Sequence, residues 1–168
     1  MHSMSMSSPF ELKRAKPAEA EAIFELVRAA YAKWIPVLGR EPIPMTADYD
    51  RAVRDNEVDV LYDSRDMVAL IQTVERADDL LIESVAVAPD WQGAGLGQRL
   101  LRHAEAKARA GKRNRISLQM NEIFGDTIRH YEAAGFRIDG RDLQDDGTMV
   151  RMSKDLAPNE VTAITAAR

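Results

Sequence analysis

The fold is decided by the stretch V-A-V-A-P-D-W-Q-G-A-G-L-G, which runs from Val85 to Gly97. Its first residues are apolar and predict a strand, its middle is rich in glycine, and its end leads into a segment with helical periodicity. A phosphate group binds where backbone N–H groups point at it from a loop without obstructing side chains, and the first turn of a helix adds a favourable dipole. The stretch therefore predicts a cradle for a phosphate or pyrophosphate group.

Two better-known phosphate loops do not fit these residues. A P-loop has Lys followed by Ser or Thr after its last glycine, whereas Gln98 and Arg99 follow Gly97 here. The dinucleotide fingerprint G-x-G-x-x-G, started at Gly93 and Gly95, puts Gln98 in the place of the third glycine. We therefore expect neither of these two nucleotide sites.

What remains is the pattern Q-x-x-G-x-G, formed by Gln92, Gly95 and Gly97, and a second motif follows it downstream. This motif is Y-E-A-A-G-F, from Tyr131 to Phe136, and it has the form Y-x-x-x-G-F. In this order the two motifs resemble those of the GNAT superfamily of acyl-CoA N-acyltransferases. The resemblance implies that the first motif binds the pyrophosphate of acetyl-coenzyme A and that the preceding strand pairs with its pantetheine arm.

The composition is typical of a soluble globular protein with one domain. The chain has 168 residues, of which 45% are hydrophobic and 30% charged, and its net charge is −4, so we expect no general attraction to nucleic acid or to an anionic membrane. It has no cysteine, which excludes disulfides, a thiolate nucleophile and an acetyl-cysteine intermediate. No apolar run approaches the roughly 18 to 20 residues that span a bilayer, and the first residues lack a signal core. These features predict a cytoplasmic protein.

Hydrophobic periodicity predicts strands and helices in a defined order between two loose ends. The helices are expected to begin at Pro17, at Thr46 as N-cap, at Leu96 and at Gly125, and the last three to end near Arg54, Ala110 and Ala134. The expected strands are Phe10 to Arg14, Val58 to Tyr62, Met67 to Val74, Leu80 to Val87, Ile116 to Met120, Phe136 to Ile138 and Met149 to Met152.

This order of elements is the one that the GNAT resemblance implies. The expected fold is α/β, in the α+β sense, with a mixed and mostly antiparallel central sheet of six to seven strands. Helices cover both faces, and the fourth and fifth strands splay apart to admit the thioester. One acetyltransferase domain is expected over residues 10–156, between loose tails at 1–9 and 157–168.

Amine acetylation needs a deprotonated amine, a polarised thioester carbonyl and a proton for the leaving thiolate. Tyr131 is the predicted catalytic acid, because a phenol with a pKa of about 10 can protonate a thiolate and the resemblance puts its hydroxyl near the coenzyme sulfur. The alternative is an aromatic core residue on an amphipathic helix. For the carbonyl, the resemblance implies that the backbone N–H of Val85 or a neighbour acts as donor.

Glu83 is the predicted base, because it is the one carboxylate in the apolar run Leu80 to Val87 and burial would raise its pKa. The alternatives are an ion pair with a neighbouring strand, a place at a solvated cleft edge, or water as the base. His103 and His130 are weaker candidates for the base, because His103 lies at the edge of a helix stripe and His130 fits a packing or surface role. Neither has ligand spacing to a carboxylate or another His, so no metal is predicted.

The predicted contacts to the coenzyme come from the strand end, the glycine-rich loop and one residue after the fifth strand. In the commoner family pattern an Asn lies seven residues before the Tyr, where this chain has Phe124, so Asn121 also fits an ordinary turn residue. The predicted coenzyme-binding residues are Val85, Ala86, Val87, Gln92, Gly93, Ala94, Gly95, Leu96, Gly97, Gln98 and Asn121.

In this superfamily the region between the first two strands selects the acceptor. Here it combines aromatic side chains with prolines and a nearby carboxylate, Asp48, a composition that suits a cationic amine through cation–π contact and ion pairing. The alternative is that these aromatics cap the core beneath a proline-rich loop. The predicted acceptor-binding residues are Tyr31, Trp34, Met45 and Tyr49.

Together these features predict an acetyl-CoA-dependent N-acetyltransferase that acts on a small primary amine or an amino-acid-like acceptor by direct attack in a ternary complex. A protein N-terminal or lysine acetyltransferase is the first alternative. A catalytically silent acyl-CoA-binding sensor or interaction module is the second. The resemblance also implies a possible homodimer.

Overall fold

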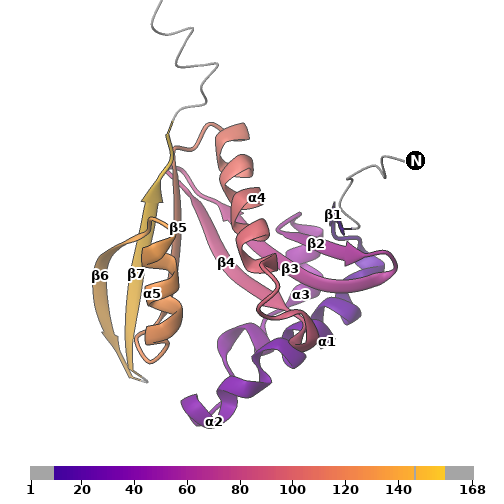
Figure 1. Cartoon of the computed structure of the whole chain (residues 1–168), viewed down its shortest axis with the longest axis horizontal. Coiled ribbons are helices and arrows are strands. Elements are labelled where there is room, and N and C mark those ends of the chain that lie inside the picture. Colours follow the sequence, from indigo (N-terminus) through magenta and orange to yellow (C-terminus); the bar gives the residue numbers. More distant parts are fainter. Residues whose placement is uncertain (1–9, 146, 158–168) are drawn as a thin grey trace, which may run out of the picture. The chain divides into compact units, whose positions relative to one another are not determined.

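The computed structural model describes residues 10–145 and 147–157 (Figure 1). The predicted tails lie outside the described residues except for Ala157. The strands are β1 (Phe10–Arg14), β2 (Val58–Asp63), β3 (Asp66–Glu75), β4 (Leu80–Val87), β5 (Arg115–Asn121), β6 (Arg137–Gln144) and β7 (Gly147–Asp155). The α-helices are α1 (Ala20–Tyr31), α2 (Ile35–Leu38), α3 (Tyr49–Arg54), α4 (Leu96–Ala110) and α5 (Gly125–Ala133), and the 3-10 turns are η1 (Pro17–Glu19), η2 (Ala32–Trp34), η3 (Ile43–Thr46) and η4 (Pro89–Trp91).

The strands form a seven-stranded sheet in the order β1-β2-β3-β4-β5-β7-β6. β1 with β2, β2 with β3, β5 with β7 and β6 with β7 are antiparallel, whereas β4 and β5 are parallel. The register of the parallel pair joins Leu80 to Ile116 and Leu81 to Ser117, so this ladder covers two positions of an eight-residue strand. The predicted fold class, a mixed and mostly antiparallel sheet whose fourth and fifth strands part, is confirmed.

The chain divides into two compact units. The first holds the described residues up to Gln72 together with Ser84–Leu100, and the second holds Thr73–Glu83 together with the described residues from Leu101 on. In the first unit α1 buries Ile23 and Val27 completely, in one core with Val58 and Val60 of β2. Each such side chain stabilises the fold by about 1.5–3 kcal/mol, so α1 is fixed on this part of the sheet.

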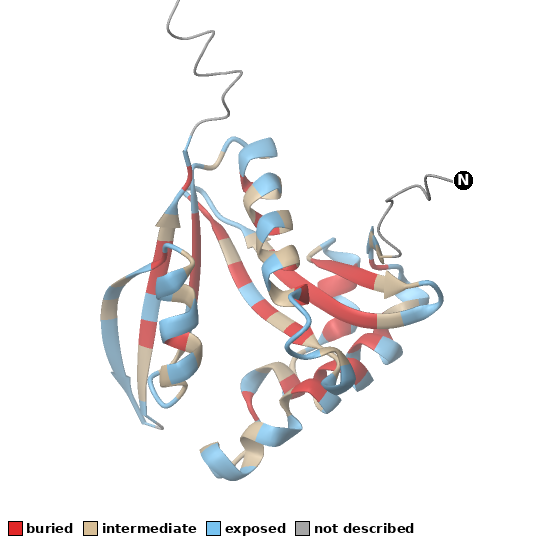
Figure 2. Cartoon of the chain, viewed as in Figure 1, coloured by how far each residue is buried: buried red, intermediate tan, exposed pale blue. Residues whose placement is uncertain are grey.

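In the second unit β7 lies between β5 and β6. The β6 register shifts between Ile138 and Gly140, and Gly140 then pairs with Arg151 of β7. Figure 2 shows that β6 is largely exposed, whereas buried and less buried residues alternate along β4. This alternation is the period of a strand with one face in the core.

Three local predictions differ from the structure. Asp48, not Thr46, is the N-cap of α3, and its Oδ1 accepts a hydrogen bond of 3.0 Å from the backbone N–H of Arg51. α2 was not predicted because it contains Pro36, which a helix tolerates only in its first turn. The last two strands are much longer than predicted, because the charged residues of β6 conceal its strand period.

Among residues 10–145 and 147–157, no helix is both long and apolar enough to cross a membrane.

Candidate active site

The loop between β4 and α4 leaves its backbone open to a ligand. Gly93 has φ = 85° and Gly95 has φ = 84°, a left-handed backbone conformation that residues other than glycine adopt only at an energetic cost. A Cβ built on either residue, or on Gly97, would meet nothing within 4 Å. The fifteen-residue helix α4 begins directly at Leu96, so its free N–H groups point toward this opening. The loop therefore fits an anionic group, as the sequence predicts.

Gln92, the first residue of the Q-x-x-G-x-G pattern, links three segments of the first unit. Its Nε2 donates a hydrogen bond of 3.0 Å to the backbone carbonyl of Val87 at the end of β4. Its Oε1 accepts a bond of 2.6 Å from Nζ of Lys33, which lies in η2. Lys33 was missed by the sequence analysis, since no pattern in a sequence joins residues that lie 59 positions apart.

Aromatic contacts fix the base of the same loop. The rings of Phe10 and Trp91 meet edge to face at 5.5 Å between centroids. The guanidinium of Arg99, at the end of the first turn of α4, also lies over the Phe10 ring, 5.4 Å from its centroid. Such contacts stabilise by about 0.5–1.5 kcal/mol each. β1, η4 and α4 are thereby held together around the glycines.

Tyr31 contacts β4 at the residue whose N–H the resemblance assigns to the thioester carbonyl. Its hydroxyl donates a hydrogen bond of 2.7 Å to the backbone carbonyl of Val85. Burial raises the pKa of Tyr31, and this keeps the phenol protonated as a donor. Because the N–H and C=O of one strand residue point to the same side, the N–H of Val85 points to the side of the strand on which the Tyr31 hydroxyl lies.

The four predicted acceptor-binding residues have different environments. Met45 and Tyr49 are 2% and 3% exposed, and the Tyr49 hydroxyl donates to the carbonyl of Pro44, so both are core residues beneath the proline-containing turn. This burial contradicts the prediction that Met45 and Tyr49 contact the acceptor. It agrees with the alternative that they pack in the core. Tyr31 and Trp34 are partly exposed, and Nζ of Lys33 lies 5.3 Å from the Trp34 ring centroid.

In the second unit the Y-x-x-x-G-F motif ends helix α5. Tyr131 is partly exposed, and its ring meets the buried Phe136 edge to face at 5.3 Å. The backbone N–H of Phe136 donates to the carbonyl of Tyr131 at 3.0 Å, and Gly135 between them has φ = 101°. The glycine thus permits the tight helix end that sets Phe136 beneath the Tyr131 ring.

Glu83 is exposed, so the expectation that it is buried was wrong. The alternation along β4 puts Leu80, Ile82 and Ser84 in the core and turns Glu83 to the other face. The pKa of Arg76 is raised, first by its hydrogen bond to Asp79, and the charge of Glu83 adds to this effect. Glu83 is thus an exposed carboxylate whose charge acts on Arg76, and its role as the base stays a prediction.

Asn121 is the last residue of β5, and its Oδ1 accepts a hydrogen bond of 3.0 Å from the backbone N–H of Ile123. This is the geometry of an Asx-type turn. Its role toward the coenzyme stays a prediction. Within the part of the chain that the structure describes, no three His, Asp or Glu side chains gather as metal ligands.

A family model described as the acetyltransferase (GNAT) domain matches residues 54–138, which is half of the chain. The chain belongs to the GNAT superfamily. The match contains the glycine-rich loop and both motifs that carried the resemblance. Membership implies acyltransferase activity for this GNAT protein.

Solved structures agree with this GNAT fold. A putative acetyltransferase from Salmonella typhimurium, solved with acetyl-CoA, is 21% identical with a TM-score of 0.66, and the match covers 91% of this chain and 99% of that one. A spermidine N-acetyltransferase chimera from Vibrio cholerae and hSSAT is 18% identical with a TM-score of 0.69, covering 88% and 96%. The ribosomal-protein-S18-alanine N-acetyltransferase from Escherichia coli is 19% identical with a TM-score of 0.69, covering 90% and 97%. No curated protein matches the chain by sequence.

Proposed function

We propose that this protein is an acetyl-CoA-dependent N-acetyltransferase that transfers the acetyl group to a small primary amine or an amino-acid-like acceptor. The observation that carries the proposal is the loop at Gly93 and Gly95, whose backbone is open and lies at the start of α4. A similar fold has been solved with acetyl-CoA. Open N–H groups at a helix start suit the pyrophosphate of this cosubstrate.

The cosubstrate contacts come from two neighbouring segments of the first unit. The strand residues Val85, Ala86 and Val87 would pair with the amide groups of the pantetheine arm, and the loop from Gln92 to Gln98 would hold the pyrophosphate. The ammonium of Lys33 adds a positive charge next to Gln92. Asp90 is a negative charge in the same loop, so the Lys33 ammonium offsets its repulsion of an anionic ligand.

The reaction we propose is direct attack of the acceptor amine on the thioester carbonyl. The nitrogen forms the amide bond, the carbon–sulfur bond breaks, and the leaving thiolate takes a proton from the hydroxyl of Tyr131. The N–H of Val85 stabilises the negative charge on the carbonyl oxygen. Either Glu83, which is exposed, or water takes the proton that the amine loses, and this proton returns through water to the Tyr131 phenolate.

For the acceptor we retain Tyr31 and Trp34 of the four predicted residues. A cation already lies over the Trp34 ring, since the Lys33 ammonium is 5.3 Å from its centroid. That contact is with the chain's own lysine, so the support for an amine acceptor is that the partly exposed rings of Tyr31 and Trp34 are aromatic surfaces of the kind that attract ammonium groups. A similar fold occurs in a spermidine N-acetyltransferase chimera.

A protein acceptor is the second candidate function. Val37 and Ile43 are 46% and 61% exposed on α2 and η3, the segments of the first unit that lie between α1 and α3. Exposed aliphatic side chains favour contact with a peptide. The ribosomal-protein-S18-alanine N-acetyltransferase has a similar fold.

Calorimetric titration with acetyl-CoA, followed by a free-thiol release screen on the same sample, tests these proposals. We expect tight binding, and thiol release with one class among polyamines, amino acids, aminoglycosides and short peptides. If only peptides cause thiol release, the acceptor is a protein and not a small molecule. Binding without release from any class would identify an acyl-CoA-binding module, and absence of binding would refute the proposed cosubstrate. Light scattering on the same sample tests the predicted homodimer.

A further inference from the structure

A polar pocket of about 380 Å³ lies in the second unit. Its lining comes from β4, β5, β6, β7 and the turn that precedes β4. Pockets of this size hold small molecules. The charged residues of the lining are Arg76, Asp79, Arg115, Asp139 and Arg151.

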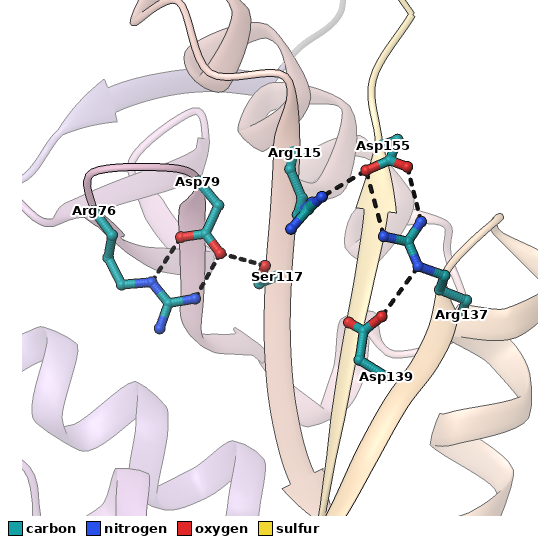
Figure 3. A network of polar contacts seen from close by, with 7 residues as sticks. All are labelled: Arg76, Asp79, Arg115, Ser117, Arg137, Asp139 and Asp155. Carbon is teal, nitrogen blue, oxygen red and sulfur yellow. Dashed lines mark hydrogen bonds and ion pairs between the residues drawn. The ribbon is translucent and has the colours of Figure 1, made fainter.

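Asp79 is a buried carboxylate in the wall of this pocket, and its own bonds satisfy it. Nε and one terminal nitrogen of Arg76 donate to its two oxygens, each at 2.6 Å, in a bidentate pair. The hydroxyl of Ser117 donates a third bond of 2.6 Å (Figure 3). The pKa of Asp79 is lowered, chiefly by the bond to Arg76. With three charge-assisted bonds, this carboxylate has little need of a further cation.

A second group of ion pairs borders the pocket on the side of β6 and β7. Asp139 accepts a bond of 3.0 Å from Nε of Arg137, and Arg137 also donates to Asp155 at 2.9 Å. Nε of Arg115 donates to the same Asp155 at 3.1 Å. In Figure 3 the Arg115 guanidinium lies between this group and the Asp79 group. Both carboxylates of the lining are therefore already paired.

The three guanidinium groups of the lining have more donors than these bonds use. A guanidinium carries five N–H groups, whereas the bonds described use two nitrogens of Arg76 and one of Arg115. Arg151 uses one nitrogen, Nε, in a bond of 2.7 Å to Asp142. The charges of these arginines are balanced by Asp79, Asp139, Asp142 and Asp155, but the lining keeps an excess of N–H donors. Such a lining favours a group that only accepts hydrogen bonds.

The lining also contains a buried hydroxyl group that makes no hydrogen bond to any of the described residues. Ser153 of β7 stands opposite Ser117 of β5 in the antiparallel register, so the two side chains share one face of the sheet. Ser153 is 3% exposed, and its Oγ has no hydrogen-bond partner within the described part of the chain. An unpaired buried hydroxyl costs about 1–3 kcal/mol, and rotation about one bond can turn it toward a ligand. Leu81 adds an apolar surface to the same lining.

We propose that this pocket binds the carboxylate group of a small organic acid. The carboxylate accepts hydrogen bonds from Arg115 and Arg151, and the short carbon chain of the acid contacts Leu81. Binding at this pocket can be measured without acetyl transfer, because it concerns residues of the second unit and a ligand other than the cosubstrate. Two sources share this chemistry: an amino-acid acceptor and a regulatory acid without an amine.

Calorimetric titration of the full chain with glutarate and with L-glutamate tests the site, because the two acids differ by one amine. We expect binding of glutarate in the millimolar range or tighter, and a loss of about tenfold in affinity for Arg115→Gln, which removes charge-assisted bonds. Arg151→Gln should show a similar loss. Arg141→Gln is the matched control, because Arg141 lies on β6 beside Glu122 at 3.6 Å, outside the lining.

Each outcome decides the proposal. No binding of millimolar glutarate or glutamate, or equal losses in Arg115→Gln, Arg151→Gln and Arg141→Gln, would overturn it. If inorganic phosphate binds more tightly than either acid, the pocket is a phosphate site and the proposed carboxylate ligand is wrong. If both acids bind and L-glutamate also releases thiol from acetyl-CoA, with a KM that rises in Arg115→Gln, the bound acid is the acceptor. If both bind and glutamate releases no thiol, the acid is a regulator.

Discussion

Nζ of Lys33 lies 2.6 Å from Oε1 of Gln92, so the segment after α1 is tied to the first residue of the glycine-rich loop. The other end of the Gln92 amide is held by the Val87 carbonyl. One side chain thus orders the end of β4, the loop and η2 together. The ammonium is also a charge beside the proposed pyrophosphate site.

Lys33→Met should weaken acetyl-CoA binding about five- to tenfold, because it removes both a charge and the bond that orients Gln92. The dependence of the affinity on salt should also become weaker. Calorimetry at two ionic strengths measures both effects. Lys13→Met is the control, since Lys13 is an exposed lysine of the same unit that lies over the Tyr62 ring. An equal effect of the two substitutions would show that only net charge matters.

Gly95→Glu should reduce acetyl-CoA affinity about a hundredfold or more, because it places a carboxylate and a side chain in the open loop. The control is Gly39→Glu. Gly39 has φ = 73° and a Cβ there would also meet nothing within 4 Å, so backbone strain and added charge are matched outside the loop. A folded Gly95→Glu protein with unchanged affinity would refute the proposed cradle.

Tyr131→Phe should lower kcat about a hundredfold and leave acetyl-CoA affinity nearly unchanged, because the ring contact with Phe136 persists while the proton donor is lost. Steady-state kinetics and calorimetry on the same variant measure the two quantities. His130→Gln, one residue earlier on α5, is expected to keep the normal rate. A Tyr131→Phe enzyme with full kcat would assign the acid to another residue.

Asp79→Asn should lower the free energy of unfolding at neutral pH by about 1–2 kcal/mol, a value reduced for the half-exposed Arg76 partner. Folding lowers the pKa of Asp79, so its contribution is fully present above the ordinary value of 3.8 and is lost as the pH falls through the lower folded value. The difference between the two proteins should therefore shrink below about pH 4. Denaturation at several pH values measures it. Asp139→Asn, at an exposed carboxylate, is expected to have a smaller effect, and a constant difference down to the acid limit would contradict the ion-pair explanation.

The sequence predicted most of the fold because its strongest patterns are local. β1, β4 and α4 have the predicted bounds, since alternation and helical periodicity are unbroken there. β6 was predicted at a fraction of its length, because an exposed strand with Arg and Asp on it carries no apolar period. The N-cap of α3 was predicted at Thr46 but is Asp48, because the two residue types have similar capping preferences.

The candidate site was predictable where a backbone conformation selects glycine, as at Gly93 and Gly95. It was not predictable where partners come from distant segments. The bond from Lys33 to Gln92 and the ion pairs around Asp79 depend on strand order and register. The burial of Met45 and Tyr49 has the same origin, since an aromatic or thioether side chain is equally common in a core and at a binding surface.

Gly140 pairs with Arg151 across β6 and β7, and a Cβ at this glycine would collide with the Arg151 guanidinium. Replacing Gly140 by Ala must therefore push that guanidinium aside, although Gly140 is not part of the pocket lining. A single methyl group added at Gly140 would thus change the shape of the pocket and the position of the Arg151 charge in it. A substitution at Gly140 would therefore alter the proposed acid site without changing any residue that lines it.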